Sequence, residues 1–391
     1  MIELAEAQAR LFALREPVES VDVPLSGALG RWASADVLAQ RTQPARNLSA
    51  MDGYAVVSAD GTGSRRVIGE SAAGRLFAGK VRAGEAVRIF TGAVVPDGAD
   101  CIVVQEEAER DGDVVTLSGG APQPSQHIRH AGSDFAAGAV LIAKGEQITP
   151  ARVGLAAMGG HAMLPVARRL RVALISTGDE LVAPGSPTAD DQIPSANAPM
   201  LAALLATLPV EVQDCGIVPD DLDALQSVFS SLADADIIVT IGGASVGDHD
   251  LVRPALEAAG ANLDFWKIAM RPGRPVMAGR LGDAVVLGLP GNPVSAYVTA
   301  LLLLKPLIAY LCGANDPLPA RVEAKLGAPM PANGNRLDHV RGLLTGSTIV
   351  PVGRDDSSML AALAQSNTLI IRDINAPAAL PGDAVLCVDM R

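Results

Sequence analysis

The sequence has few aromatic residues and no long uninterrupted apolar run. Apolar residues make up 49% of the chain but aromatic residues only 3%, so its cores must be built from Ala, Val, Leu and Ile, which suits sheets flanked by helices. No apolar run reaches the roughly eighteen residues that a membrane helix needs. The first residues include Glu3 and Glu6 and show no signal-peptide core. These absences predict a cytosolic protein that does not engage a membrane.

Cysteine and positive charge are also scarce. The four cysteines are far apart and form no Cys-x-x-Cys pair, so they suggest neither a zinc site nor a disulfide framework. The formal net charge of -12 argues against a nucleic-acid partner, because duplex binding depends on neutralising phosphates with Lys and Arg. An anionic substrate would therefore need a locally basic pocket.

The length of the chain and the changes of residue pattern along it predict several domains. At 391 residues the chain exceeds the size of one hydrophobic core. Residues 2–14 show helical spacing, and residues 51–107 carry short Val and Ile runs between Gly and Pro turns, which predicts a small inserted β unit. The C-terminal residues after a Gly, Asn, Asp and Pro-rich linker at 312–319 also read as mostly β, with strands expected at 348–352, 368–371 and 384–388.

The middle of the chain alternates between strand and helix signals. Continuous apolar strands of this kind predict a mostly parallel sheet covered on both faces. Strands are expected at 172–175, 236–241 and 284–289, and helices at 199–206, 222–233 and 294–310.

A glycine-rich turn follows the second of these strands. The segment from Asp236 to Asp250 contains Gly242, Gly243, Ser245 and Gly247. Without side chains, successive glycines let backbone N–H groups point at one oxygen cluster, and open α/β sheets place ligands beyond the carboxyl ends of their strands. The motif predicts an anion site. A tight turn that binds no ligand is the alternative when this motif is judged alone.

Two further motifs strengthen the anion hypothesis. Pro290, Gly291 and Asn292 lead through Pro293 into a helix that includes Ser295, and exposed N–H groups at such a helix start attract phosphate or carboxylate. A helix start capped by Asn292, without a ligand, is the alternative. Between the two turns lie three cations in eight residues of an acidic chain, suited to an oxyanion: Lys267, Arg271 and Arg274. Solvated surface residues that bind no ligand are the alternative.

Three acids in turns are candidates for a magnesium site. They are Asp52, Asp134 and Glu180. Magnesium prefers oxygen ligands and commonly takes only one or two carboxylates with substrate phosphates and waters. For each acid alone, capping of its own turn is the competing interpretation.

The order of the motifs resembles the MoeA family, which includes the gephyrin E domain, over essentially the whole chain. The resemblance rests on the motifs quoted above and on four more: Val-Pro-Leu-Ser-Gly-Ala-Leu-Gly-Arg-Trp at 23–32, Ser-Ala-Met-Asp-Gly-Tyr at 49–54, Ile-Phe-Thr-Gly-Ala at 89–93, and Ser-Thr-Gly-Asp-Glu-Leu at 176–181. It implies a molybdopterin molybdenumtransferase, in which adenylated molybdopterin and molybdate give the finished cofactor and AMP, with Mg²⁺ at the phosphoanhydride. A MogA-like molybdopterin adenylyltransferase and a non-catalytic molybdopterin-binding scaffold are the alternatives.

The resemblance also implies an architecture. The expected fold class is multidomain α/β and β: a MogA-like three-layer α/β domain, an inserted small β-barrel-like domain, an elongated N-terminal α+β domain and a C-terminal β domain. The expected bounds are 1–44 with 132–168 for the N-terminal linker and dimerisation domain, 45–131 for the inserted domain, 169–313 for the α/β domain and 318–391 for the C-terminal domain. The implied partners are a second copy with an active cleft shared across the dimer, a MogA-like adenylating protein and molybdoenzyme acceptors.

By motif match, each candidate residue receives an implied role. The catalytic candidates are Asp52, Glu180, Lys267 and Arg271, with the cation held by Asp52, Asp134 and Glu180. The substrate-binding candidates are Thr91, Asp236, Gly242, Gly243, Ser245, Gly247, Asp250, Arg274, Pro290, Gly291, Asn292, Ser295, Arg341 and Ser357. The family commonly has Lys-Pro-Gly-Lys-Pro where this chain has Arg271-Pro-Gly-Arg274-Pro, which keeps the charge but raises tungstate as an alternative ion. The Gly-Arg-Asp-Asp-Ser-Ser at 353–358 replaces a more glycine-rich turn and puts Ser357 in doubt.

Overall fold

The computed structural model describes residues 1–243, 251–353 and 356–390. The chain forms two compact units. Unit 1 comprises Met1–Ala35, Lys144–Thr149 and Pro165–Arg391, and unit 2 comprises Asp36–Ala143 and Pro150–Leu164. The segments of unit 2 lie between segments of unit 1 in the sequence. Each unit therefore contains contacts between residues that are distant in sequence.

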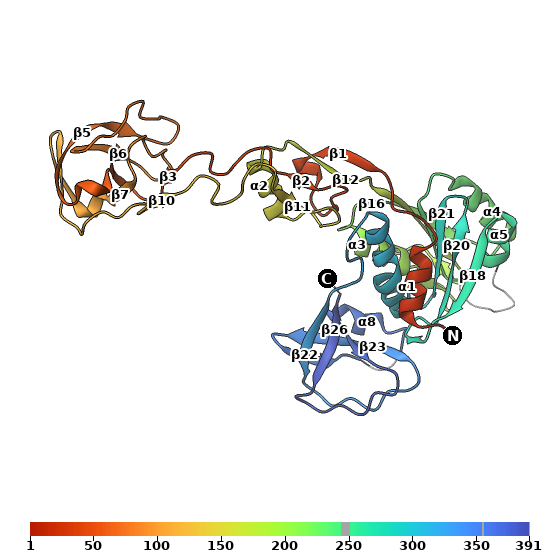
Figure 1. The fold of residues 1–391 in the computed structure, drawn as a ribbon. Helices are drawn as coiled ribbons and strands as arrows, with labels where there is room; N and C mark the ends of the chain where they lie inside the picture. Colours follow the sequence, from red (N-terminus) through yellow and green to blue (C-terminus); the bar gives the residue numbers. More distant parts are fainter. Residues whose placement is uncertain (244–250, 354–355, 391) are drawn as a thin grey trace. The chain divides into compact units, whose positions relative to one another are not determined.

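A six-stranded sheet organises most of unit 1 (Figure 1). Four neighbouring strands are parallel. At one edge of the sheet, β20 pairs antiparallel with the last of these four, and β18 pairs antiparallel with β20. In spatial order the strands are β16 (Val210–Val218), β13 (Leu170–Thr177), β17 (Ile237–Ile241), β21 (Ala284–Leu289), β20 (Pro275–Leu281) and β18 (Asn262–Lys267). Every residue of β17 and β21 is buried, as expected for central strands of a parallel sheet covered on both faces.

Helices cover both faces of this sheet. Alternate strand residues such as Val172 and Leu174 pack in one core with α1 (Leu4–Phe12), α3 (Asn197–Leu205) and the helical run α6 (Pro293–Thr299), η4 (Ala300–Leu304) and α7 (Lys305–Leu311). Their neighbours Ala173 and Ile175 pack in a second core with α4 (Leu222–Ser231) and α5 (Val252–Ala258). The result is the three-layer α/β arrangement that was expected.

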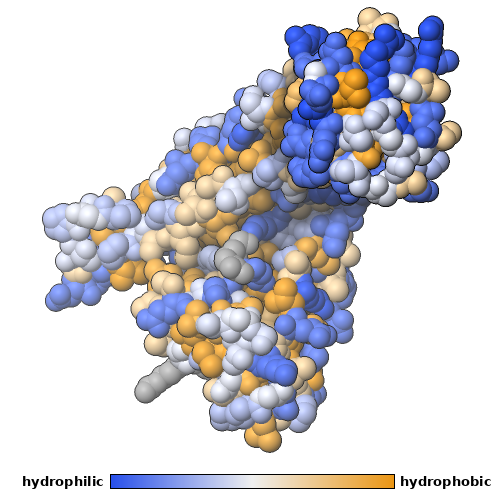
Figure 2. All heavy atoms as spheres, turned by 90° about the vertical axis from the view of Figure 1, so that its left-hand side faces the viewer, coloured by the Kyte–Doolittle hydropathy of each residue, from blue (hydrophilic) through white to orange (hydrophobic). Residues whose placement is uncertain are grey.

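The run from α6 to α7 is the only helix in the described part of the chain that is long and apolar enough to cross a membrane by length and composition. It spans Pro293–Leu311, and 83% of its most apolar stretch is buried inside the protein. On the face seen in Figure 2, hydrophobic and hydrophilic residues are interspersed. The burial identifies this segment as a core helix of unit 1.

A second six-stranded sheet occupies the C-terminal part of unit 1. Leu326, Ile349, Ile370 and Cys387 form its core, and α8 (Leu360–Ala364) accompanies it. The strands in spatial order are β19 (Met270–Arg271), β23 (Leu337–Thr345), β24 (Thr348–Pro351), β22 (Arg321–Leu326), β26 (Ala384–Asp389) and β25 (Thr368–Arg372). Because β19 comes from the α/β segment, the pairing of β19 with β23 joins the two sheets directly beside Arg271.

Unit 2 contains a third six-stranded sheet. Tyr54 and Val56 pack into one apolar core and Ala55 into another, so β4 contributes to both faces. The strands in spatial order are β7 (Cys101–Val104), β4 (Gly53–Val56), β6 (Glu85–Ile89), β5 (Gly63–Ser71), β9 (Val114–Leu117) and β8 (Ala108–Asp111).

Shorter elements complete the described part of both units: β1 (Ser20–Pro24), η1 (Leu25–Gly27), β2 (Val37–Leu38), β3 (Leu48–Ser49), η2 (Ser58–Asp60), η3 (Gln105–Glu107), β10 (Ile128–Arg129), β11 (Val140–Ile142), α2 (Pro150–Met158), β12 (Met163–Ala167), β14 (Leu181–Val182) and β15 (Ile193–Pro194).

The expected fold class, multidomain α/β and β, is confirmed. The four domain ranges stay a prediction. Three strands of the central sheet, β16, β18 and β20, were not among those expected from the sequence. In β16 the reason is visible: as an edge strand it exposes Glu211, Gln213 and Asp214, so it has no continuous apolar run.

Candidate active site

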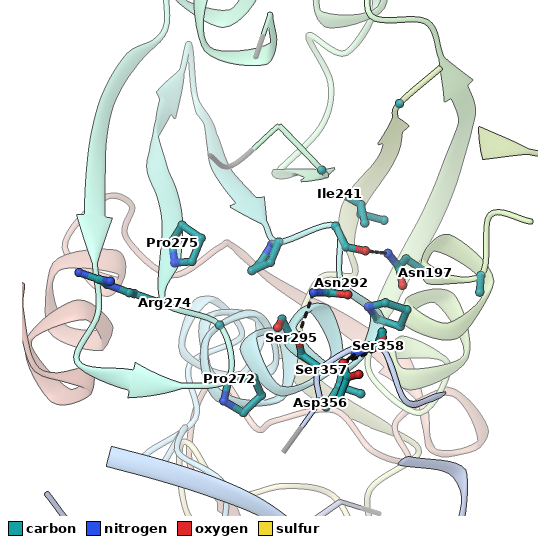
Figure 3. A pocket seen from close by; sticks show the side chains of 18 of the residues that line it. Asn197, Ile241, Pro272, Arg274, Pro275, Asn292, Ser295, Asp356, Ser357 and Ser358 are labelled. Atoms are coloured by element: carbon teal, nitrogen blue, oxygen red, sulfur yellow. Dashed lines mark hydrogen bonds between the residues drawn. The ribbon is translucent and has the colours of Figure 1, made fainter. Parts of the chain in front are cut away.

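A cavity of about 990 Å³ lies at the carboxyl ends of the parallel strands in unit 1. Ser176 and Thr177 end β13, Ile241 ends β17, and Pro290 follows β21; all four line the cavity. This is the edge at which open α/β sheets bind their ligands. Arg341 of β23 and Ser357, which lies between β24 and α8, also line the cavity. Figure 3 shows Ser357 beside Asn292 at the start of α6.

The glycine turn after β17 lines the cavity, but it does not present all of its N–H groups. Gly242 has a φ of 98° and Gly243 of 63°, and a Cβ at Gly242 would lie 2.9 Å from the carbonyl oxygen of Thr177. Glycine is therefore required at 242 by a close backbone approach. The N–H of Gly242 donates to the carbonyl of Leu289 at 3.1 Å, so the expectation that it points at a ligand is wrong.

The remainder of that motif lies outside the described residues. Ser245, Gly247 and Asp250 belong to this segment, and their proposed contacts with substrate stay predictions.

The start of α6 contributes a second wall, and its asparagine does not cap the helix with its side chain. The Nδ2 of Asn292 instead donates to the Ser357 hydroxyl at 2.9 Å, and the N–H of Val294 donates to the Ser357 carbonyl at 3.1 Å (Figure 3). Gly291 and Ser295 also line the cavity. Ser357, which the sequence left in doubt, is thus brought directly to the Pro-Gly-Asn-Pro turn.

Arginines supply the positive charge of the cavity. Arg271, Arg274 and Arg341 all line it. The Nε of Arg271 donates to the Oδ2 of Asp338 at 3.0 Å, and Asp338 is only 5% exposed, so this guanidinium is held in one orientation. Lys267, at the end of β18, is exposed and does not line the cavity.

Carboxylates gather at another part of the same wall. Glu180 and Asp220 line the cavity, and the N–H of Asp220 donates to the Oδ1 of Asp179 at 3.2 Å. Desolvation, followed by the charges of Asp179 and Glu180, raises the pKa of Asp220 above its usual range. Such mutual repulsion is relieved by a bound cation, so these oxygens suit a hard divalent ion. Within the described ranges no group of three or more His, Cys, Asp or Glu residues is arranged to hold a metal.

Three candidates belong to unit 2. The Oδ1 of Asp52 accepts hydrogen bonds from both the N–H and the hydroxyl of Thr91, each at 2.7 Å. These bonds, followed by the charge of Arg88, lower the pKa of Asp52, so it stays ionised at neutral pH. Asp134 lies in an exposed turn, where its N–H donates to the carbonyl of Gln43. The structure thus joins Asp52 to Thr91.

Asp236 is not at the cavity. It precedes β17, at the opposite end of that strand from Gly242, and is 3% exposed. Its carboxylate accepts two hydrogen bonds from Arg168, at 2.6 and 2.7 Å, and one from the N–H of Arg171, and it lies 2.8 Å from Arg15. Burial acts to raise the pKa of Asp236, but these donors and the two arginine charges lower it overall. The geometry makes Asp236 part of a buried ion-pair cluster, contrary to the substrate-positioning role expected from its place beside the glycine motif.

The sequence analysis missed many of the residues that line the cavity, among them the polar side chains of Asn197, Asp220, Arg336, Asp338, His339 and Asp356. Asn197 donates from Nδ2 to the Gly291 carbonyl at 2.6 Å, while its buried Oδ1 has no hydrogen-bond partner among the described residues. Burial, followed by the charge of Arg321, lowers the pKa of His339 to about 4, so the ring is neutral. The charged segments 220–223 and 336–341 were the local signals that could have marked several of them.

Comparison with known protein families covers nearly the whole chain. Three family models match: the MoeA N-terminal region (domain I and II) at residues 2–160, the probable molybdopterin binding domain at 173–310, and the MoeA C-terminal region (domain IV) at 323–389. The cavity is therefore built by the second and third of these regions.

Individual relatives agree. The molybdopterin molybdenumtransferase of Haemophilus influenzae is 36% identical over 381 residues, covering 95% of this chain and 94% of the relative. Molybdopterin molybdenumtransferase 2 of Mycobacterium tuberculosis is 35% identical, with 95% of each chain covered. The crystal structure of the molybdopterin biosynthesis MoeA protein from Pyrococcus horikoshii OT3 superposes with a TM-score of 0.86 at 25% identity and covers 100% of both chains. The chain therefore belongs to the MoeA family of molybdopterin molybdenumtransferases.

Proposed function

We propose that this chain is a molybdopterin molybdenumtransferase, an enzyme of molybdenum cofactor biosynthesis that inserts molybdate into adenylated molybdopterin and releases AMP. The relatives that carry that name match 95% of this chain. The observation that carries the proposal is the cavity itself, which lies at the carboxyl ends of the parallel strands. Four arginines, a glycine turn and the carboxylates of Glu180 and Asp220 line it; the arginines are Arg271, Arg274, Arg336 and Arg341.

The charge of the cavity fits an anionic substrate. Arg271, Arg274 and Arg341 concentrate positive charge in a chain whose net charge is -12. Guanidinium groups bind phosphate and tetrahedral oxyanions through paired N–H donors. Since Asp338 holds Arg271 in place, the oxyanion meets a donor whose orientation is already set, and orientation of this kind lowers a reaction barrier.

We assign a magnesium ion to the Glu180 and Asp220 side of the cavity. The fit rests on geometry: Glu180 and Asp220 line the same cavity, and the N–H of Asp220 donates to the Oδ1 of Asp179 at 3.2 Å. Burial, followed by the charges of Asp179 and Glu180, raises the pKa of Asp220. When bound, the ion neutralises charge on the phosphoanhydride. Asp52 and Asp134, the other two metal candidates, belong to unit 2; the Asp52 carboxylate, held ionised by Thr91, is suited to the same task.

The other assignments belong to the same proposal. Arg271 holds molybdate or phosphate, and Arg274 and Ser357 bind substrate. Lys267 is not given this role, because it lies outside the cavity. Tungstate is the alternative ion because Arg replaces Lys at both cationic positions of the turn. We further propose a homodimer, a cytoplasmic location, a MogA-like adenylating protein as supplier of the substrate and molybdoenzymes as recipients of the product. Sedimentation of the purified chain tests the dimer.

The direct test is molybdate-dependent AMP release from adenylated molybdopterin in the presence of magnesium. Arg271→Ala should lose most of the activity, whereas Arg280→Ala, which removes an exposed arginine of β20 outside the cavity lining, should behave like the wild type. Transfer of AMP from ATP without molybdate-dependent release would instead indicate an adenylyltransferase. Tight pterin binding with no turnover would indicate a scaffold, and either result refutes the proposal.

A further inference from the structure

A second cavity, of about 500 Å³, lies at the amino end of β13 in the central sheet, at the opposite end of that strand from the candidate active site. Four arginines line it: Arg31, Arg168, Arg169 and Arg171. It is found where β13 begins, whereas the candidate active site is found where β13 ends, and an eight-residue strand separates the two by roughly 23 Å. It is therefore a separate site that the proposed reaction does not use.

Local structure explains why the arginines converge. Arg168 and Arg169 occupy the two-residue turn between β12 and β13, and Arg171 is the second residue of β13. Arg31 follows η1, and its N–H donates to the carbonyl of Ala28. A tight turn and a neighbouring loop thus bring four guanidinium groups to the wall of one cavity. Like charges at short range repel one another, and a negative charge between them lowers that repulsion.

Arg31 carries most of that cost. It is 6% exposed, its Nη2 donates to the carbonyl of Ala167, and its Nε has no hydrogen-bond partner among the described residues. Burial, followed by the charge of Arg169, lowers the pKa of Arg31. A buried guanidinium that contacts a carbonyl but no carboxylate is incompletely compensated.

The acids that line the cavity do not supply the missing charge. Glu19 is taken up by Arg168, whose Nε donates to it at 2.5 Å, and Arg168 also binds the buried Asp236. The Arg171 and Asp234 side chains are 3.6 Å apart and 59% and 91% exposed, so their attraction is weak.

The third acid on the wall is Glu211, an exposed residue of β16. In the part of the chain that the structure describes, no carboxylate lies within 4.0 Å of the Arg31 or Arg169 guanidinium. These two residues hold the positive charge that a ligand would neutralise.

We propose that this cavity, which we call the arginine cavity, binds a compact tetrahedral dianion of the phosphate class. The chemistry of the wall selects such a ligand. Of its described lining residues only Val21 is apolar and none is aromatic, so nothing is present to stack on a base or a pterin ring. Paired guanidinium N–H groups match the oxygen spacing of phosphate.

Titration of the full-length protein with inorganic phosphate, followed by calorimetry and by thermal unfolding, tests this inference. The informative variant is Arg169→Gln with Arg171→Gln, because both side chains are exposed and their removal should leave the fold intact. Replacement of Arg31 is avoided because it is buried. We expect the double variant to bind phosphate at this site about tenfold more weakly or worse, the loss expected for one charge-assisted hydrogen bond. Arg253→Gln, which removes an exposed arginine of α5, is the matched control and should bind like the wild type.

Phosphate can also enter the candidate active site, so the two sites must be separated. In a background that carries both Arg271→Gln and Arg274→Gln, the arginine cavity should keep its full affinity. The double change at Arg169 and Arg171 should then shift the remaining phosphate-dependent rise in melting temperature to about tenfold higher phosphate concentration. Equal stabilisation by chloride at matched ionic strength would overturn the proposal, as would unchanged phosphate affinity in the double variant. Because the readout is binding and not turnover, these outcomes are independent of the proposed transferase activity.

Discussion

Replacement of Asp236 by Asn distinguishes the structural role of this carboxylate from the substrate-binding role that its sequence position suggested. In the structure it accepts from Arg168 twice and from the N–H of Arg171, with Arg15 2.8 Å away. Asn keeps the size and one acceptor oxygen but removes the negative charge. Two arginines would then be left without their buried counter-ion.

The expected loss is large. Removal of one partner from a buried ion pair costs about 3–5 kcal/mol, and the oxygen that Asn retains places this change near 3 kcal/mol. With the urea dependence of a protein of this size, about 3 kcal/mol per M, the unfolding midpoint should fall by about 1 M. Asp234→Asn is the control, since Asp234 lies two residues away but its side chain is 91% exposed, and it should leave the midpoint unchanged.

The ion pairs of Asp236 with Arg168 and Arg15 also predict how the free energy of unfolding depends on pH. The folded-state pKa of Asp236 is lowered from the ordinary value of 3.8, so its contribution is fully present above about pH 4 and is lost as the pH falls through the folded-state pKa. The difference in stability between the wild type and Asp236→Asn should therefore be constant near neutral pH and shrink in acid.

Urea unfolding and steady-state kinetics together decide the question. If Asp236 is structural, the folded fraction of Asp236→Asn should keep the wild-type KM for the pterin substrate. An unfolding midpoint equal to that of the wild type, combined with a raised KM, would show that the carboxylate contacts substrate and would refute the assignment.

Three further changes test the candidate site. Gly242→Ala should lower stability by about 1–3 kcal/mol, because alanine must adopt a positive φ beside the Thr177 carbonyl, and urea unfolding measures this loss. Asp338→Asn removes the charged partner that orients Arg271 and should raise the KM for molybdate by about tenfold. Because Arg271 is 39% exposed, the loss of stability should be smaller than that of Asp236→Asn, and an unchanged KM would argue against positioning of Arg271. Asp52→Ala should abolish AMP release while the circular dichroism spectrum stays that of the wild type, and full activity would remove Asp52 from the reaction.

Much of the central fold could be predicted from the sequence because its inner strands are buried on both faces. β17 and β21 are continuous apolar runs, and they were expected within a residue of where they lie. The edge strand β16 has no such run, since half of its surface meets solvent. Pairing between distant segments, such as β19 with β23, leaves no local pattern at all.

The candidate site divides in the same way. Arg271 and Arg274 stand out because they are cations beside glycine and proline in an acidic chain, and both line the cavity. Asp338 has no such setting and becomes visible only through its contact with Arg271. Asp236 received its role from the motif match, but it precedes β17 whereas Gly242 follows it, so the five residues of that strand separate Asp236 from the cavity.

The junction between the two sheets of unit 1 makes the cavity depend on the C-terminal part of the chain. The contact of Arg271 with Asp338 requires the pairing of β19 with β23, and the contact of Asn292 with Ser357 requires the segment after β24. A chain cut before β23 would therefore lack both contacts and every lining residue from Arg336 onward.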